Sequence, residues 1–230
     1  MFSFFDDFLS LFFPPCCEVC GEGLISKECL ICTSCIGHLP YTDWHKGIDN
    51  PLQKVFWGKI SARGVTAMFY FHQGGRVQKM LHKLKYKGVK ELGVYLGELY
   101  GMQLKKAFPF SEVDLIVPVP LHPKRQKKRG YNQSEQFANG IALSMGIKVI
   151  TANLIRKKPS QTQTKKTKIQ RWENVKDIFE IKNPEQFVGK HILIVDDVIT
   201  TGSTLESCGK ILLEISDVSI SVAAIAAAHR

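Results

Sequence analysis

Residues 191–204, HILIVDDVITTGST, constrain the fold of this chain more than any other stretch. The run 191–197 opens with apolar residues and is typical of a strand buried on both faces, as in a parallel sheet. Asp196 and Asp197 stand side by side at its end, and a segment of threonine, glycine and serine follows. Residues 202–214 then have a helical pattern. This order predicts an open α/β sheet that binds its ligand beyond the carboxyl end of the strand.

The rest of the chain alternates in the same way. We expect further strands at 64–71, 113–119, 147–150, 177–181 and 217–227, and further helices at 73–86, 89–106 and 131–145. Segment 38–60 has a loop-like composition. Since strands alternate with helices, the sequence predicts a mostly parallel α/β sheet flanked by helices. A chain of 230 residues permits one domain and a small module, which we expect at 61–230 and 1–60.

The small module is defined by cysteines, since six of the seven lie between positions 16 and 35. They include two C-x-x-C pairs, a spacing that lets each pair present two thiolates from one tight turn. Four thiolates suit a structural zinc ion. The expected ligands are Cys17, Cys20, Cys32 and Cys35. Cys16 and Cys29 are spare, and either could replace one of them. We expect Cys208, alone in a predicted helix, to be a buried small hydrophobe.

The opening segment MFSFFDDFLSLFFPP does not resemble a signal peptide, because it carries two acids and lacks a basic start. We expect a short amphipathic helix whose phenylalanines dock on the protein. No apolar run reaches the roughly 18 residues that a membrane helix needs. We therefore expect no membrane span and a cytoplasmic protein, a compartment in which disulfides are rare.

The formal net charge is +10, and the basic residues are clustered. Segments 76–90, 124–129 and 156–171 together hold 18 of the 31 lysines and arginines and no acid. They could be solvated faces. They also fit a positive field for a polyanion, either a multiply phosphorylated small molecule or nucleic acid.

The opening motif fits a sugar phosphate. Small residues let the loop backbone approach a phosphate, hydroxyls add donors, and the helix N-terminus adds positive potential. The carboxylates of Asp196 and Asp197 can accept hydrogen bonds from two vicinal hydroxyls. The expected phosphate-binding residues are Thr200, Thr201, Gly202, Ser203 and Thr204.

Residues 192–204 resemble the signature of the type I phosphoribosyltransferases, which bind 5-phosphoribosyl-1-pyrophosphate (PRPP) with Mg²⁺. The resemblance implies that Asp196 and Asp197 hold the ribose 2′- and 3′-hydroxyls and that 200–204 hold the 5′-phosphate. It also implies that the loop after strand 113–119 contacts the pyrophosphate. The residues concerned are Val119, Pro120, Leu121 and Arg129.

The whole chain resembles one branch of that superfamily, the ComF (competence protein F) family. The similarity rests on the four-cysteine module, LKYKG at 84–88, VPVPLHPKRQKKRGYNQSE at 117–135, a basic loop that ends in Arg171, Asn174 and Phe179, and the PRPP signature. It implies a role in DNA uptake and in handling single-stranded DNA, together with other DNA-uptake proteins. The residues expected to contact single-stranded DNA are Lys85, Lys87, Lys127, Lys128, Lys165 and Arg171. Tyr86, Tyr131 and Trp172 are the rings on which its bases could stack.

The sequence leaves catalysis open. Loop 157–170 is rich in lysine and could cover a reacting ligand. The position three places after the acid pair, where purine salvage transferases carry a carboxylate, holds Thr200, which argues against a 6-oxopurine acceptor. Phe2 follows Met1, so no glutaminase nucleophile is present there. The alternative function is a metabolic phosphoribosyltransferase that makes a nucleotide from PRPP and an unidentified acceptor.

Overall fold

The computed structural model describes residues 15–25, 28–47, 49–157 and 178–228. The helix expected in the opening segment lies outside these ranges, as does nearly all of the loop expected at 157–170. Among the described residues, no helix is long and apolar enough to cross a membrane.

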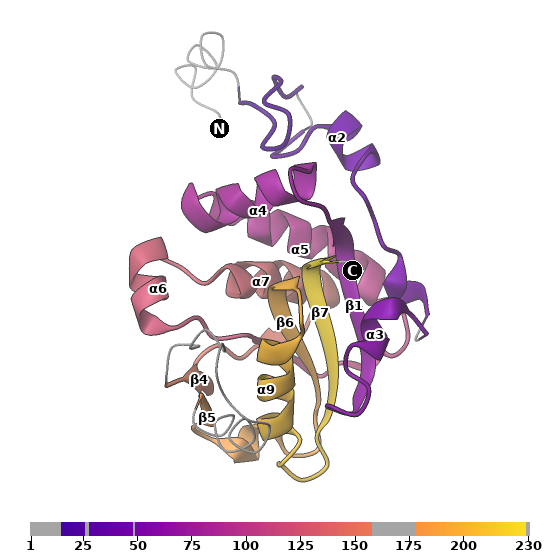
Figure 1. Ribbon diagram of the computed structural model, residues 1–230, viewed down its shortest axis with the longest axis vertical. Coiled ribbons are helices and arrows are strands. Elements are labelled where there is room, and N and C mark those ends of the chain that lie inside the picture. Colours follow the sequence, from indigo (N-terminus) through magenta and orange to yellow (C-terminus); the bar gives the residue numbers. More distant parts are fainter. Residues whose placement is uncertain (1–14, 26–27, 48, 158–177, 229–230) are drawn as a thin grey trace.

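A five-stranded parallel sheet forms the centre of the molecule (Figure 1). Its order is β1 (Ala62–Phe71), β7 (Ser219–Ala228), β6 (His191–Ile199), β2 (Leu115–Pro118) and β3 (Lys148–Val149). All four neighbouring pairs run parallel, which confirms the α/β sheet predicted from the alternating pattern. A separate antiparallel pair is formed by β4 (Leu154–Arg156) and β5 (Phe179–Ile181).

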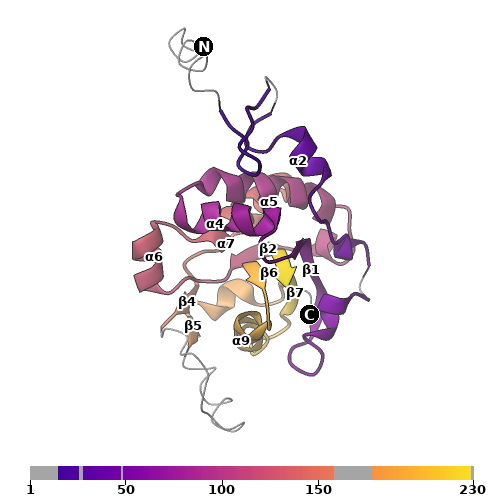
Figure 2. The same ribbon diagram turned by 45° about the horizontal axis from the view of Figure 1, so that its top comes forward.

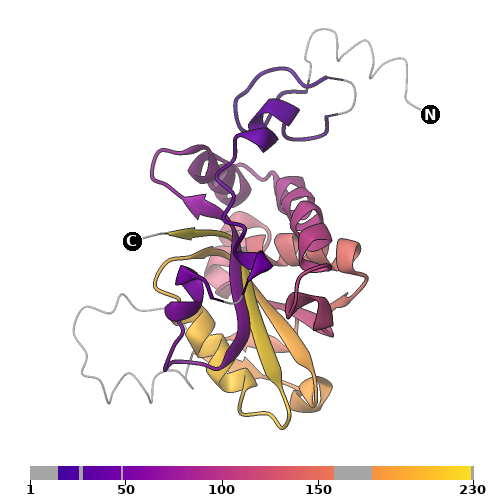
Figure 3. The ribbon, with the colours of Figure 1, turned by 90° about the vertical axis from the view of Figure 1, so that its right-hand side faces the viewer.

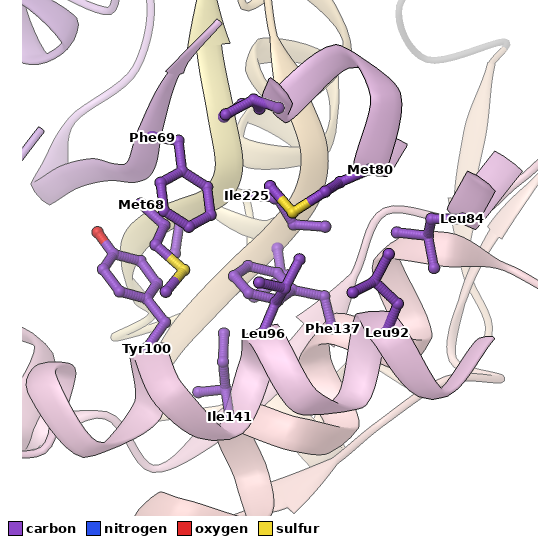
Figure 4. Close-up of a cluster of buried hydrophobic side chains, with 14 of the residues drawn as sticks. Met68, Phe69, Met80, Leu84, Leu92, Leu96, Tyr100, Phe137, Ile141 and Ile225 are labelled. Atoms are coloured by element: carbon purple, nitrogen blue, oxygen red, sulfur yellow. The ribbon is translucent and has the colours of Figure 1, made fainter. Parts of the chain in front are cut away.

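Helices cover both faces of the sheet (Figures 2 and 3). One face packs against α4 (Arg76–Tyr86), α5 (Lys90–Leu104) and α7 (Gln133–Met145). The other packs against α9 (Ser203–Leu212), α3 (Pro51–Lys54) and the 3-10 helix η3 (Pro184–Phe187). Successive residues of β6 serve the two cores in turn, because side chains alternate across a strand: Leu193 and Val195 join the first, and Ile192 and Ile194 the second. Figure 4 shows the first cluster, in which side chains from β1, α4, α5 and α7 meet.

Helices α5 and α7 pack closely because glycines face each other where they meet. A Cβ atom at Gly140 would overlap the carbonyl oxygen of Val94, and one at Gly97 would lie 2.8 Å from the Cα of Gly140. No side chain fits between the two backbones. This contact fixes α7, whose first turn reaches the polar edge of the sheet.

We expect Gly140→Ala to lower the free energy of unfolding by about 3 kcal/mol, because overpacking forces the two helices apart. Urea denaturation monitored by circular dichroism measures this change. The matched control is Gly37→Ala, in the short helix α2 (Thr33–Gly37), where an added Cβ would meet nothing within 4 Å. Equal stability of the two variants would contradict the close contact.

The cysteine module lies above α4 in Figure 1 and shares its core. Val19, Ile31 and Leu39 belong to the same buried cluster as Leu81 of α4. An ion pair between Glu18 and Lys83, 2.9 Å long, adds a polar contact at the edge. The module is therefore attached to the helical layer over the sheet.

The structure contains several elements that the sequence did not predict, among them α2, β4 and η3. Segment 38–60, expected as loop, contains the 3-10 helix η1 (Trp44–Lys46) and α3, which begins with proline and is capped by Asn50. Basic residues 124–129 lie in helix α6 (Pro123–Arg129), which has Pro123 at its start and Gly130 in the left-handed conformation at its end, a common pair of helix boundaries. A 3-10 helix, η2 (Phe110–Glu112), precedes β2. The other expected elements begin or end within a few residues of the ranges found.

Candidate functional site

The sequence had indicated that the acid pair stands at the end of its strand. In the structure the pair lies inside β6. The strand continues to Ile199 because β7 pairs with it all the way, with Asp196 opposite Ala224 and Ile199 opposite Ala227. On its other side, β2 stops at Pro118, opposite Val195. Asp196 and Asp197 are therefore the first residues of β6 beyond the end of β2, at the carboxyl edge of the sheet, where ligands of parallel α/β folds bind.

Asp196 is held by two donors. Its Oδ1 atom accepts a hydrogen bond of 2.9 Å from the hydroxyl of Ser134 and one of 2.8 Å from the backbone N–H of Asp197. Burial raises the pKa of Asp196 to about 7, and the neighbouring charge of Asp197 acts in the same direction. The donors and the ammonium of Lys85 only partly offset these effects. Asp196 can therefore gain or lose a proton near neutral pH.

Asp197 is paired with a lysine from a distant part of the chain. Its Oδ2 atom lies 2.9 Å from Nζ of Lys85, at the end of α4. Both side chains are largely buried, with 16% of Asp197 and 22% of Lys85 exposed. The pair thus links α4 to the carboxyl edge of the sheet.

Residues 200–202 join β6 to α9, and Ser203 and Thr204 are the first residues of that helix. Gly202 has a φ of 73° and stands just before the first residue of α9. A Cβ there would also lie 2.9 Å from the ring of Phe56, so glycine is required for both conformation and space. Thr200, Thr201 and Ser203 are exposed, and the hydroxyls of the last two lie 3.0 Å apart. Hydroxyls and the helix N-terminus therefore reach solvent together.

Some backbone groups of the loop after β2 already form hydrogen bonds within the protein. Val119 donates its N–H to the carbonyl of Val195 at 2.8 Å, and its own carbonyl accepts from the side chain of Asn132 at 2.9 Å. Pro120 has no N–H, so Leu121 carries the backbone donor that remains in this turn. Asn132 also caps α7 through the N–H of Ser134. The sequence reasoning did not single out Asn132 and Ser134, although both lie in the quoted run RGYNQSE.

A basic pocket of about 460 Å³ opens between the end of α4 and α6, which lies at the left of Figure 1. Its lining contains no acid and consists of Lys85, Tyr86, Gly88, Arg125, Lys128 and Arg129. Lys85 lines this pocket and also pairs with Asp197, so the pocket adjoins the acid pair.

Tyr86 is the aromatic feature of this pocket. Its side chain is 60% exposed, and the guanidinium of Arg129 lies 5.2 Å from the ring centroid. Arg129 is itself fixed by Gln133, at 2.8 Å. Tyr131 differs from Tyr86, because its hydroxyl donates to the carbonyl of Leu84 and its ring packs against the core.

Some of the residues expected to contact single-stranded DNA do not line this pocket. Lys87 and Lys127 are exposed near it but do not line it. Lys165, Arg171 and Trp172 lie outside the described residues. Arg125, which the sequence reasoning left without a role, does line it.

The four expected zinc ligands meet in one cluster. The sulfur atoms of Cys17, Cys20, Cys32 and Cys35 all lie within 4.8 Å of one another. Cys20 and Cys32 are 3.8 Å apart, close to the roughly 3.8 Å edge of a tetrahedron with zinc–sulfur bonds of about 2.3 Å. Cys16 and Cys29 are exposed and stand outside the cluster. The donor set and its spacing therefore fit a tetrahedral metal ion.

Hydrogen bonds prepare this cluster for thiolates. Cys17 accepts from the N–H groups of Cys32 at 3.3 Å and Val19 at 3.4 Å. Burial opposes ionisation of Cys17, but these N–H groups and that of Cys20 lower its pKa to about 6. Burial raises the pKa of Cys35 to about 12, so a cation is needed to keep all four sulfurs deprotonated. Cys208 is fully buried in α9, as expected, and burial raises its pKa.

Comparison with known proteins places this site in context. Residues 132–230 match a family model described as a phosphoribosyl transferase domain. The DNA utilization protein YhgH of Escherichia coli K12 is 29% identical over 201 residues, which cover 86% of this chain and 83% of that protein. Competence protein F of Haemophilus influenzae is 28% identical over 216 residues, 90% of this chain and 87% of that protein. Competence protein ComFC of Bacillus subtilis is 28% identical over 138 residues, 60% and 54% of the two chains.

Proposed function

Because the chain belongs to the ComF family of the type I phosphoribosyltransferase superfamily, we propose that it binds PRPP and handles single-stranded DNA during DNA uptake. One observation carries this proposal: the acid pair shares Lys85 with a basic pocket that presents an exposed aromatic ring. A diol-binding site and a polyanion-binding site thus adjoin each other. A cytoplasmic location and contacts with other DNA-uptake proteins are part of the same proposal.

The ribose of PRPP lies against the acid pair in this proposal. Asp196 and Asp197 accept hydrogen bonds from the 2′- and 3′-hydroxyls, and Asp197 exchanges its bond to Lys85 for one to the sugar. The Asp196 carboxyl has a pKa raised to about 7, so ligand hydroxyls favour its ionised form when they donate to it.

The two ends of PRPP meet positive groups. The 5′-phosphate takes the exposed hydroxyls of Thr200, Thr201 and Ser203, with the backbone of Gly202 and Thr204, at the N-terminus of α9. The pyrophosphate faces the turn from Val119 to Leu121 and the side chain of Arg129. Mg²⁺ that arrives with PRPP supplies further neutralisation of the pyrophosphate charge.

A structural zinc ion in the cysteine cluster completes the cofactors. Four sulfurs with no open position suit a structural role. Its place above α4 lets the metal order the residues that hold Glu18 against Lys83, two positions from Lys85. We propose no role for this zinc ion in any reaction at the acid pair.

Single-stranded DNA fits the basic pocket because its two components are both present. Phosphates contact Arg125 and Lys128, and a base stacks on the exposed ring of Tyr86. Stacking on an aromatic ring accepts every base, so this mode carries little sequence preference.

We expect Tyr86→Ala to weaken binding of a short oligodeoxythymidine by about tenfold, since one base–aromatic stack contributes about 1–3 kcal/mol. Lys128→Ala should also weaken binding and reduce the slope of log K against log salt by about 0.7, one released counterion. Fluorescence anisotropy at several salt concentrations measures both effects.

The control is Lys148→Ala, on the edge strand β3, which removes the same charge. Lys148 lies beside Leu115, the first residue of β2, and thus at the amino edge of the sheet. This variant should leave affinity nearly unchanged. If purified protein binds Mg²⁺-PRPP but no oligonucleotide at low salt, the proposal that it handles single-stranded DNA is wrong. That result would support the alternative, a metabolic transferase with a small acceptor. If Lys148→Ala and Lys128→Ala weaken binding equally, the pocket is not the binding surface.

A further inference from the structure

A second cavity lies at the outer edge of the sheet. It has a volume of about 900 Å³ and shares no residue with the pocket beside α6. It lies beside β1, the edge strand, which β7 separates from β6 and its acid pair. Its walls come from residues 36–47 of the N-terminal module, from β1, and from the end of α5 with the following turn. The lining residues include Tyr41, His45, Met68, Leu99, Met102 and Lys106.

The walls of this cavity are mainly apolar and aromatic. Tyr41, Met68 and Leu99 form much of the interior, and Met68 is seen beside Tyr100 in Figure 4. Met102 and Phe108 stay 52% and 60% exposed although both are large and apolar. The size and lining are those of small-molecule sites, which are concave, mostly apolar and about 300–1,000 Å³.

One buried polar atom lacks a partner at this place. His45 is 6% exposed, and among the described residues nothing forms a hydrogen bond with its Nδ1 atom. The ring is fixed, because its edge packs on Tyr100 at 5.6 Å and 88°. Burial lowers the pKa of His45, which keeps the ring neutral at pH 7. Nδ1 is itself closed to solvent, so His45 contributes the body of its ring, and not a polar atom, to the wall of the cavity.

The charge of the cavity has one sign. Lys46 and Lys106 line it, and no acid does. Lys46 is already paired with Asp43 at 3.1 Å. Lys106 forms no ion pair within the described ranges. An anionic group on the ligand would therefore find an available ammonium group.

We propose that this cavity binds a small aromatic molecule that carries one anionic group, at a site separate from that for PRPP. The aromatic body lies between Tyr41, Leu99 and Met102. The anionic group lies near Lys106, and the buried ring of His45 forms part of the wall. This assignment accounts for the exposure of Met102 and Phe108 and for the ammonium group of Lys106.

Anilinonaphthalene sulfonate is a suitable probe, because it combines aromatic rings with one anionic group and fluoresces when bound. Titrated into the folded, metal-loaded full chain, it should bind with one site per chain. Met102→Glu places a negative charge at the exposed part of the cavity and should weaken binding at least about tenfold through repulsion and lost apolar contact. Leu143→Glu makes the same change at an exposed leucine of α7 outside the cavity and should have no effect.

A second pair tests the anionic group. Lys106→Ala should weaken the probe several-fold, whereas Lys105→Ala, one residue earlier and outside the lining, should not. Added Mg²⁺-PRPP should not displace the probe. The proposal is overturned by absence of binding, by equal affinity in the Met102 and Leu143 variants, or by displacement with PRPP. Near-ultraviolet circular dichroism of each variant guards against probe binding to a partly unfolded state.

Discussion

Replacement of both Asp196 and Asp197 by asparagine is expected to weaken Mg²⁺-PRPP binding by about 100-fold or more. Each carboxylate offers charge-assisted hydrogen bonds to a hydroxyl, worth about 1.5–3 kcal/mol, and an amide accepts much more weakly. Isothermal titration calorimetry with Mg²⁺-PRPP measures the loss. The control is Glu185→Gln, an exposed acid of η3, which should bind as the parent does. If the double variant stays within threefold of the parent, the sugar does not lie on the acid pair.

Asp196 also affects the stability of the fold, and here its replacement by asparagine is expected to be favourable. Burial and the charge of Asp197 raise the folded-state pKa of Asp196 from 3.8 to about 7, so the folded state holds a proton that the unfolded state releases. Stability from this group is present below pH 4 and is lost as the pH rises through 7. Asp196→Asn removes that loss and keeps an oxygen acceptor for Ser134. It should raise the free energy of unfolding at pH 8 by about 1–2 kcal/mol and change it little at pH 4. Urea denaturation at both pH values measures the difference, and a variant less stable than the parent at pH 8 would contradict it.

Loss of one cysteine of the cluster is expected to have the largest effect on folding. Cys35→Ser should reduce zinc content from one ion per chain to well below one, because three ligands hold a structural ion far more weakly than four. Structural zinc contributes about 10–16 kcal/mol in isolated zinc-binding peptides. Without the ion, Val19, Ile31 and Leu39 lose their place in the core over α4. We expect the melting temperature to fall by more than about 10 °C.

The chain supplies matched controls for this experiment. Cys16→Ser and Cys29→Ser make the same chemical change at exposed cysteines outside the cluster. Both should keep one zinc ion and the parent melting temperature, as measured by elemental analysis and circular dichroism. Metal loss in Cys29→Ser with retention in Cys35→Ser would show that a spare cysteine is the ligand.

Most of the sheet could be predicted because its strands are buried on both faces. Runs such as 192–195 and 222–227 have to be apolar throughout, and this makes them visible in the sequence. The boundaries were less certain. The extension of β6 through two acids depends on pairing with β7, a contact that no local pattern encodes. Helix α6 was missed because five of its seven residues are basic and none is buried, so it has no apolar period.

The motifs of the candidate site are visible in the sequence, whereas the contacts that support them are not. The loop and the acids are contiguous in sequence, and the cysteines are spaced for one turn each, so a local pattern is enough to nominate them. Ser134 and Asn132 support the site across 62 and 13 residues respectively, and only the folded chain brings them there. The pairing of Lys85 with Asp197 is likewise a tertiary contact.

Under the proposed function, the ion pair between Lys85 and Asp197 couples the two adjoining sites, because both ligands compete for its partners. A hydroxyl that takes the Asp197 carboxylate releases an ammonium group to the pocket beside α6, and a phosphate that draws Lys85 away exposes the carboxylate. Each occupant therefore lowers the free energy at which the other enters, and thermodynamic reciprocity requires the two effects to be equal.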